Sequence, residues 1–182
     1  MLRHIPNMLT ALRLFAAPFA ALWIIQGHDT LALTIFILAG ISDAADGFLA
    51  KRYGLKTPLG AWLDPAADKF LMFVCFLALT YKQESPLWLT ALIIARDAAI
   101  LICTAATLVF HLPMRIAALN IGKASTVAQI VYISLVLVLA AFDIDAPQLV
   151  LAAAIITGGF TLASWFAYGR LFVRALCAPK AA

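Results

Sequence analysis

Charged residues are scarce in this sequence. Asp, Glu, Lys and Arg make up only 12% of its 182 residues, whereas hydrophobic residues make up 65% and the mean hydropathy is +1.01. A soluble domain typically carries about 25% charged residues. The composition therefore excludes an ordinary soluble globular protein and predicts that the chain folds in a membrane.

Cysteine is also rare. The three copies, Cys75, Cys103 and Cys177, form no CxxC pair. This pattern excludes a disulfide framework and a zinc site, and we expect each cysteine to behave as a small buried hydrophobic residue. Low-complexity tracts and internal repeats are lacking as well. The sequence therefore predicts a single domain over residues 1–182.

Long apolar runs are what the sequence does contain. A bilayer core about 30 Å thick needs about 20 mostly apolar residues per helix. Six runs meet that length, at residues 8–26, 30–50, 60–81, 87–110, 122–142 and 147–169. Arg13 and Pro18 interrupt the first run and no A-x-A cleavage pattern follows, so we expect a retained span. The predicted fold class is an all-α integral membrane protein, a bundle of six transmembrane helices.

Positive charge is divided unevenly between the two sets of helix ends. One set carries Arg3, Lys51, Arg52, Lys56, Arg115, Lys123, Arg170, Arg174 and Lys180. The opposite loops carry Lys82 and the acids Asp29, Glu84, Asp143 and Asp145. Because Lys and Arg stay on the cytoplasmic side of a membrane, both termini and the 51–58 loop are expected in the cytoplasm.

The isoelectric point near 9.2 then reflects contact with an anionic membrane surface, and no nucleic acid is needed to explain it. We expect a bacterial inner (cytoplasmic) membrane, because a mitochondrial protein would be expected to begin with a transit peptide. Small residues in the last two spans, including Gly158 and Gly159, permit close packing within the bundle or across a homodimer.

Four of the scarce acids gather at the predicted cytoplasmic ends of the second and third spans. Asp43 and Asp46 are three residues apart, and Asp64 and Asp68 are four apart, so each pair lies on one helix face. A short loop joins the two helix ends, so all four carboxylates can converge. Such a cluster is costly at a membrane edge unless cations neutralise it. Oxygen ligands without nearby His or Cys favour Mg²⁺, Mn²⁺ or Ca²⁺ over zinc.

The residues around these acids suit a ligand that carries phosphate. Gly47 allows close approach of a ligand to the backbone, and Lys51, Arg52 and Lys56 supply positive charge. Metal ions held by carboxylates stabilise charge during phosphoryl transfer. In an alternative interpretation the acids only cap helix ends and pair with nearby Lys and Arg. A cation transporter is a second alternative, although transport predicts acids nearer the middle of the bilayer.

Residues 43–68 follow the pattern D-x2-D-G-x2-A-[KR]-x8-G-x3-D-x3-D. This pattern resembles the signature of the CDP-alcohol phosphatidyltransferases, six-span membrane enzymes that displace CMP from a CDP-linked lipid or alcohol. The resemblance implies that Asp43, Asp46 and Asp64 hold two divalent ions, Mg²⁺ or Mn²⁺. It implies that Asp68 touches the second ion and acts as the general base. The residues expected around CDP are Gly47, Lys51, Thr57, Asn7 and Thr10.

Four stretches, IPNMLTALR, LGAWLDPAADK, ARD and GKASTVAQIV, are together similar to the eukaryotic-type cardiolipin synthases of this family. The phosphatidylglycerophosphate synthases share three of them, but typically carry ARE and a second Arg where this chain has Thr104. The resemblance implies transfer from CDP-diacylglycerol to phosphatidylglycerol, with glycerol 3-phosphate as the alternative acceptor, and adds weight to a homodimer. The residues expected to bind the acceptor and its phosphate are Arg13, Arg96, Arg115 and Lys123.

The charge of the acceptor favours the lipid. Glycerol 3-phosphate is a dianion that needs several cations, whereas phosphatidylglycerol carries a single phosphodiester charge. Arg96 lies within a span, where an ionisable residue points to function; the alternative is a structural contact between helices. Asp97 is about 100° away around the helix, so the two need not pair.

Overall fold

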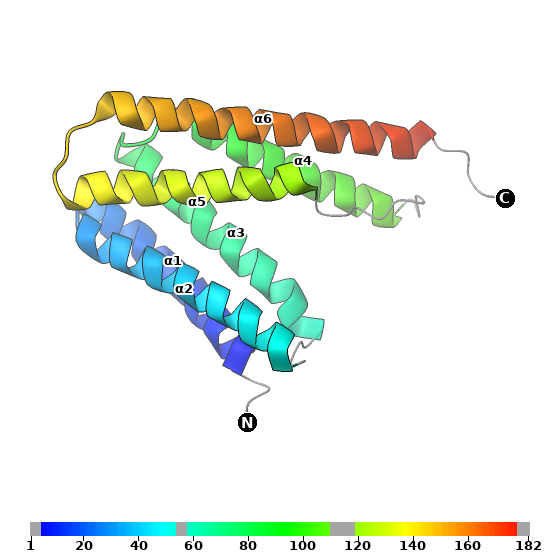
Figure 1. Cartoon of the computed structure of the whole chain (residues 1–182), viewed down its shortest axis with the longest axis horizontal. Helices are drawn as coiled ribbons and strands as arrows, with labels where there is room; N and C mark the ends of the chain where they lie inside the picture. The colour runs from blue at the N-terminus through cyan, green and yellow to red at the C-terminus, as the bar shows by residue number, and fades with distance from the viewer. Residues whose placement is uncertain (1–4, 54–57, 110–118, 178–182) are drawn as a thin grey trace. The chain divides into compact units, whose positions relative to one another are not determined.

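The structure is a computed structural model. It describes the backbone of residues 5–53, 58–109 and 119–177, and the side chains of residues 12–42, 67–106 and 119–174. Six helices follow one another: α1 (Ile5–Gln26), α2 (Asp29–Tyr53), α3 (Pro58–Tyr81), α4 (Leu87–Val109), α5 (Asn120–Ala141) and α6 (Pro147–Cys177) (Figure 1). Each one overlaps an apolar run expected from the sequence, which confirms the all-helical fold class.

Three of these helices combine the length and apolarity of a membrane span within the described part of the chain. The qualifying stretches are Leu87–Ala106, Asn120–Ala141 and Pro147–Arg174. Two shorter apolar stretches, Leu12–Gln26 and Asp29–Ser42, lie on α1 and α2. Large apolar side chains are widely exposed, and such surfaces suit contact with lipid. The chain is therefore a membrane protein.

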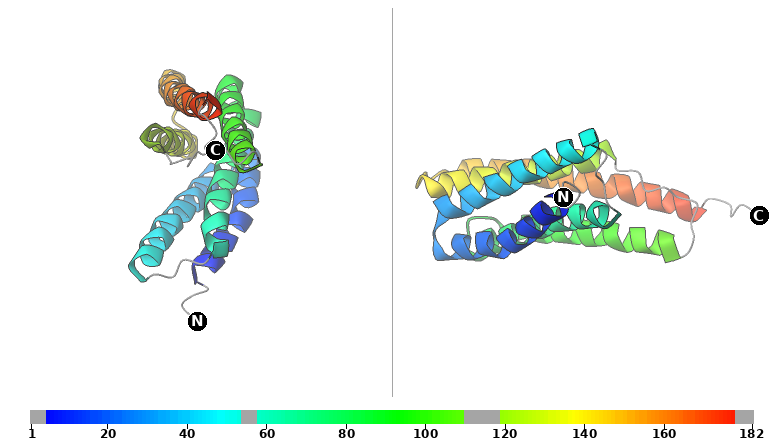
Figure 2. Two further views of the ribbon diagram at one scale, coloured as in Figure 1. Left: turned by 90° about the vertical axis from the view of Figure 1, so that its right-hand side faces the viewer. Right: turned by 90° about the horizontal axis from the view of Figure 1, so that it is seen from below.

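The described residues group into two compact units. The first, unit 1, comprises Met1–Ser85 and Ile133–Pro147, and so contains α1, α2, α3 and the C-terminal part of α5. Within it α1 packs against both α2 and α3. In both views of Figure 2, α1 runs alongside α3. Helix α2 diverges from α3, and the separation between them grows toward the C-terminal end of α2. The buried side chains are mostly apolar and include Ala17, Ala20, Ile24, Ala32, Phe36, Leu71, Cys75 and Phe76.

Small buried residues such as alanine let helix backbones approach closely in a membrane, where dispersion contacts replace the hydrophobic effect as the source of association. Cys75 is fully buried in this interior, as expected for a small hydrophobic residue. Cys103 is partly buried, and the side chain of Cys177 lies outside the described residues.

Three helices of unit 1 end in the same kind of cap. Positive φ angles occur at Gly27 (78°), Gln83 (64°) and Asp143 (52°), just after α1, α3 and α5. In each case the following amide donates to a carbonyl five residues back, as Glu84 does to Leu79 at 2.9 Å. This Schellman arrangement satisfies carbonyls at a helix end. Glycine adopts the left-handed conformation without strain, and the other two residues carry a side chain there.

Lys82 joins the start of α2 to the end of α3. Its Nζ donates to both carboxylate oxygens of Asp29, at 2.8 and 2.7 Å, and lies 2.7 Å from Glu84 Oε1. Partial burial alone would lower the pKa of Lys82, but the two carboxylates outweigh it and raise that pKa above its usual value. The ion pair of Lys82 and Asp29 thus joins the start of α2 to the end of α3, at the helix ends that residues 54–57 do not connect.

The second unit, unit 2, comprises Pro86–Tyr132 and Gln148–Ala182, and so contains α4, the N-terminal part of α5 and α6. Hydrogen bonds between buried polar side chains join α5 to α6. Ser125 Oγ and Thr161 Oγ1 are 3.3 Å apart, and Gln129 Nε2 donates to them at 3.4 and 3.5 Å. Polar contacts of this kind hold helices together where lipid offers no competing partner.

Gly158 brings α4 close to α6. A Cβ at this position would lie 2.9 Å from Trp88 Cζ3, so the tryptophan ring occupies space that only glycine leaves open. This confirms the expected close packing at Gly158 within the bundle. At the neighbouring Gly159 no heavy atom lies within 4 Å of the Cβ position.

Helix α6 is longer than the apolar run that predicts it. The run ends near residue 169, but the helix continues to Cys177 through Arg170 and Arg174. Arg170 ends the predicted apolar run, but arginine and leucine are good helix formers, so the helix continues beyond that point.

Candidate active site

The four aspartates lie on helical backbone toward the ends of α2 and α3 that residues 54–57 connect. Only residues 54–57 separate Tyr53 from Pro58, so the two helix ends are at most about 18 Å apart. Asp43 lies ten residues before Tyr53 and Asp68 ten residues after Pro58, which places each about 15 Å from its helix end. Asp46 and Asp64 lie one turn nearer the linker. The two pairs therefore occupy matching depths.

The N-terminal end of α1 lies at the same end of unit 1, because α1, α2 and α3 run up, down and up (Figure 1). Arg13 is eight residues into α1, about 12 Å from its start, and thus at the depth of the aspartates. Its side chain is only 3% exposed. A buried guanidinium is stable only among anionic or polar groups. Arg13 is therefore buried at the depth of the aspartates, and its anion-binding role stays a prediction.

Several of the expected site residues have undescribed side chains. These are Asp43, Asp46, Asp64, Gly47, Lys51, Asn7 and Thr10, and both Thr57 and Arg115 lie wholly outside the described residues. Asp68 is described and half-buried. Among the described side chains, no three His, Cys, Asp or Glu groups lie close enough to hold a metal ion. The convergence of the four carboxylates therefore stays a prediction.

The donor set itself fits hard divalent ions. Four carboxylates at spacings of three and four, on helices whose ends are tied by four residues, supply oxygen ligands alone. Mg²⁺ and Mn²⁺ prefer such ligands, whereas zinc prefers nitrogen and sulfur. The residues present are therefore compatible with the metal chemistry expected from the sequence.

Arg96 is a buried charge among the described side chains of unit 2, at 4% exposure. Its Nη2 and Nε donate to Ser164 Oγ on α6, at 2.6 and 3.2 Å. Its Nη1 donates to Asp97 Oδ1 at 2.6 Å, so the neighbours pair although their helix positions diverge. The long arginine side chain can turn back along its own helix. Arg96 thus makes the contact between helices that was the alternative interpretation, and its phosphate-binding role stays a prediction.

Tyr168 of α6 completes the surroundings of Arg96. The guanidinium carbon lies 5.8 Å from the centre of the Tyr168 ring, within the range of a cation–π contact. The Tyr168 hydroxyl accepts a hydrogen bond from the amide of Leu119 at 3.2 Å, just before α5 begins. Lys123, in the first turn of α5, is exposed. Sequence reasoning missed Ser164 and Tyr168, because nothing in a run of apolar and small residues marks which ones face Arg96.

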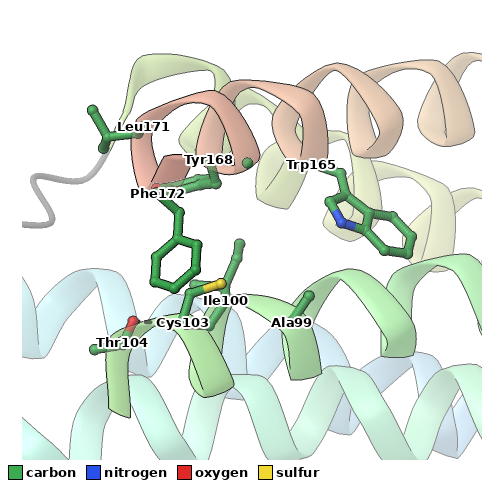
Figure 3. Close-up of a pocket in the computed structure, with 9 residues that line it drawn as sticks. Ala99, Ile100, Cys103, Thr104, Trp165, Tyr168, Leu171 and Phe172 are labelled. Carbon is green, nitrogen blue, oxygen red and sulfur yellow. Dashed lines mark hydrogen bonds between the residues drawn. The ribbon is translucent and has the colours of Figure 1, made fainter. Parts of the chain in front are cut away.

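A small crevice lies beside this cluster between α4 and α6 (Figure 3). Its volume is about 40 Å³, and its walls are mainly apolar. Phe172 extends from α6 toward Ile100 and Cys103 of α4. Thr104 also lines it, and its hydroxyl donates to the carbonyl of Ile100 at 2.7 Å. The region two turns along α4 from Arg96 is therefore apolar.

Comparison with known proteins gives a match over most of the chain. A family model described as CDP-alcohol phosphatidyltransferase matches residues 3–168. The cardiolipin synthase (CMP-forming) of Homo sapiens is 43% identical over 94 residues, which are 51% of this chain and 31% of the human protein. The protein of the same name from Streptomyces coelicolor is 39% identical over 105 residues, 54% of this chain and 48% of the relative.

A second kind of relative is equally similar. The CDP-diacylglycerol–glycerol-3-phosphate 3-phosphatidyltransferase of Cereibacter sphaeroides is 43% identical over 90 residues, 47% of this chain and 40% of the relative. The matched stretches cover less than half of the length of each of these three relatives.

Proposed function

Because this chain belongs to the CDP-alcohol phosphatidyltransferase family, we propose that it transfers the phosphatidyl group of CDP-diacylglycerol to phosphatidylglycerol, forming cardiolipin and releasing CMP. One observation carries the proposal. The two acidic pairs of the family signature lie at matching depths on α2 and α3, within the residues that the family model matches.

The aspartates divide the chemistry between them. Asp43, Asp46 and Asp64 would hold two divalent ions, Mg²⁺ or Mn²⁺, with Asp68 touching the second. When bound, the ions supply positive charge that stabilises the pyrophosphate. Asp68 accepts the proton of the acceptor hydroxyl as that oxygen attacks the phosphorus bearing diacylglycerol. The new phosphorus–oxygen bond replaces the one to CMP, and CMP departs with the electron pair.

The residues around the aspartates would bind the two substrates. Gly47, Lys51, Thr57, Asn7 and Thr10 would line the CDP pocket. Arg13, Arg96, Arg115 and Lys123 would bind the acceptor and its phosphate. The described surroundings of Arg96 support the lipid acceptor, because the region around Thr104 is an apolar crevice and lacks a second arginine on α4. A dianionic acceptor needs several cations, whereas a phosphodiester needs fewer.

The alternative acceptor is glycerol 3-phosphate. Similarity to the Cereibacter sphaeroides relative, at the same identity as the human one, favours this second candidate. Both reactions use the same donor and release the same nucleotide, so they differ only in the attacking hydroxyl.

The proposed setting is a bacterial inner membrane crossed by all six helices. Lys and Arg gather at one set of helix ends, which supports cytoplasmic termini and an active site that faces the cytoplasm. We also propose a homodimer, on the family resemblance and the small residues of α6.

The test offers CDP-diacylglycerol with each acceptor separately to the purified protein in mixed micelles, and measures CMP release. We expect release with phosphatidylglycerol, loss of release with a chelator, and recovery with Mg²⁺ or Mn²⁺. Preference for glycerol 3-phosphate would overturn the acceptor assignment. Absence of CMP release with either acceptor would overturn the proposed function.

A further inference from the structure

A single side chain of α6 contacts both other helices of unit 2. The Tyr168 hydroxyl accepts the Leu119 amide at 3.2 Å, and the Tyr168 ring lies under the Arg96 guanidinium, 5.8 Å from centroid to Cζ. One contact holds the start of α5 and the other holds the charged group of α4. Tyr168 therefore couples the position of Arg96 to the position of the first turn of α5.

Gly122 makes this arrangement possible. A Cβ on Gly122 would lie 2.8 Å from Tyr168 Oη, 3.0 Å from Tyr168 Cε2 and 3.4 Å from Arg96 Nη2. Side chains essentially never approach a Cβ as closely as 2.8 Å, so any other residue would displace the tyrosine ring, α5 or both. A glycine within a helix costs about 1 kcal/mol relative to alanine. Gly122 offsets that cost by leaving the space that the side chains of Tyr168 and Arg96 occupy.

The same contact places Arg96 against the first turn of α5, which also carries Lys123. Arg96 Nη2 reaches the first turn of α5, next to the backbone of Gly122, and Lys123 is the following residue. Arg96 is buried and held by Ser164 and Asp97, whereas Lys123 is exposed. The Tyr168–Gly122 contact therefore places the guanidinium of Arg96 beside the turn of α5 that carries Lys123.

We propose that Gly122 and Tyr168 are positioning residues that determine how tightly the acceptor phosphate binds. They act through Arg96 and Lys123 and do not touch the acceptor themselves. This inference rests on the proposed function, in which those two cations bind the acceptor. Small displacements of binding groups lower catalytic efficiency strongly, since productive geometry tolerates little error.

The test compares Gly122→Ala, Tyr168→Phe and the double variant, with Michaelis constants measured separately for CDP-diacylglycerol and the acceptor. We expect Gly122→Ala to raise the acceptor KM about tenfold, with kcat and the CDP-diacylglycerol KM within about twofold of wild type. Phenylalanine removes the oxygen nearest the new methyl group. The double variant should therefore have a lower acceptor KM than Gly122→Ala alone, a recovery that general weakening of the fold would not produce.

Gly159→Ala is the matched control, because it also replaces a helical glycine but meets no heavy atom within 4 Å. Its kinetic constants should equal those of wild type. If Gly122→Ala fails to fold, the Tyr168→Phe variant alone tests the inference. An acceptor KM of Tyr168→Phe equal to that of wild type would then overturn the inference. The inference is also overturned if Gly122→Ala raises the KM of the acceptor and that of CDP-diacylglycerol equally. It is overturned as well if the kinetic constants of Gly122→Ala match those of Gly159→Ala.

The two proposals fail in different ways. A wild-type protein that releases no CMP would remove the proposed function and this inference with it. A wild-type protein that is active, with variants whose acceptor KM does not change, would remove only the inference.

Discussion

The two units bury different kinds of side chain. Among the described side chains, the interior of unit 1 is mainly apolar, with alanine, leucine and phenylalanine between α1, α2 and α3 and Arg13 as a buried exception. Unit 2 buries a series of polar side chains, Thr90, Arg96, Ser125, Gln129, Thr157, Thr161 and Ser164. In unit 1 the ion pair of Lys82 lies where α2 begins and α3 ends, and the acidic pairs lie within about 15 Å of the ends of α2 and α3 that residues 54–57 connect. The buried polar groups of unit 2 are distributed over α4, α5 and α6.

This difference assigns different tasks to the two units. Apolar surfaces pack against lipid as readily as against each other, so hydrogen bonds between helices give unit 2 a defined arrangement. Polar groups at helix ends can reach water and charged substrates. We therefore expect substitutions of the acids in unit 1 to lower turnover, and substitutions of the polar residues in unit 2 to lower stability.

The largest expected effect is that of Asp68→Asn. Asparagine keeps the size of the side chain but cannot accept the proton, so kcat should fall by about 10²–10⁴-fold while the protein stays folded. CMP release and thermal unfolding in detergent measure the two quantities. Asp143→Asn, at an exposed position after α5, is the control and should keep full activity. Residual turnover above a tenth of wild type would contradict the assignment of the base.

Ser164→Ala tests the polar interior of unit 2. It removes the oxygen that accepts two hydrogen bonds from the buried guanidinium of Arg96. Loss of a hydrogen bond to a buried charged group costs about 1.5–3 kcal/mol. We expect a clear drop in the unfolding midpoint of the purified protein. An unchanged midpoint would mean that the polar contacts of unit 2 do not hold it together.

A smaller loss is expected for Thr161→Val. Thr161 of α6 makes hydrogen bonds to Ser125 and Gln129 of α5. Its hydroxyl also donates to the Thr157 carbonyl within α6 at 2.8 Å. Hydrogen bonds between helices in membranes contribute about 0.6 kcal/mol on average, so the free energy of unfolding should fall by roughly that amount. Unfolding titrations in mixed micelles measure it.

The matched control for Thr161→Val is Thr126→Val. Thr126 donates to the Gly122 carbonyl of its own helix at 3.2 Å. Loss of this hydrogen bond within α5 should therefore lower the free energy of unfolding less than Thr161→Val does. If the two variants lose equal stability, the contacts across α5 and α6 contribute nothing beyond the bond within each helix.

Lys82→Met gives the smallest effect and depends on pH. Because the folded pKa of Lys82 is raised, the ion pair stabilises the protein fully below the unfolded pKa of about 10.4. That stabilisation is lost as pH rises further, through the folded pKa. The stability difference between wild type and variant should thus be constant from pH 7 to 9 and shrink above pH 10.5. A difference that does not shrink at all above pH 10.5 would argue against the ion pair.

Much of the fold is predictable from hydropathy. The run at 87–110 matches the helix Leu87–Val109 almost residue for residue, since Pro86 and the apolar composition define it. The end of α6 is not predictable in this way, because Arg170 interrupts the apolar run while arginine is a good helix former, so the helix continues past it. The candidate site is predictable where the spacing of residues in the sequence places acids on one helix face, as it does for Asp64 and Asp68.

The contacts around Arg96 are not predictable in the same manner. Helical geometry separates Arg96 from Asp97 by about 100°, yet their side chains meet at 2.6 Å. Side-chain length and the surroundings on α6 decide that contact, and no local pattern records them.

The sequence by itself determined that this chain is helical, belongs in a membrane and carries two acidic pairs on neighbouring helices. Those properties follow from composition and spacing, which act locally along the chain. Only the tertiary structure decided that Ser164 and Tyr168 hold Arg96, and that Gly122 leaves the space for them. These contacts join residues up to 68 positions apart, and they depend on how three helices pack rather than on what each helix contains.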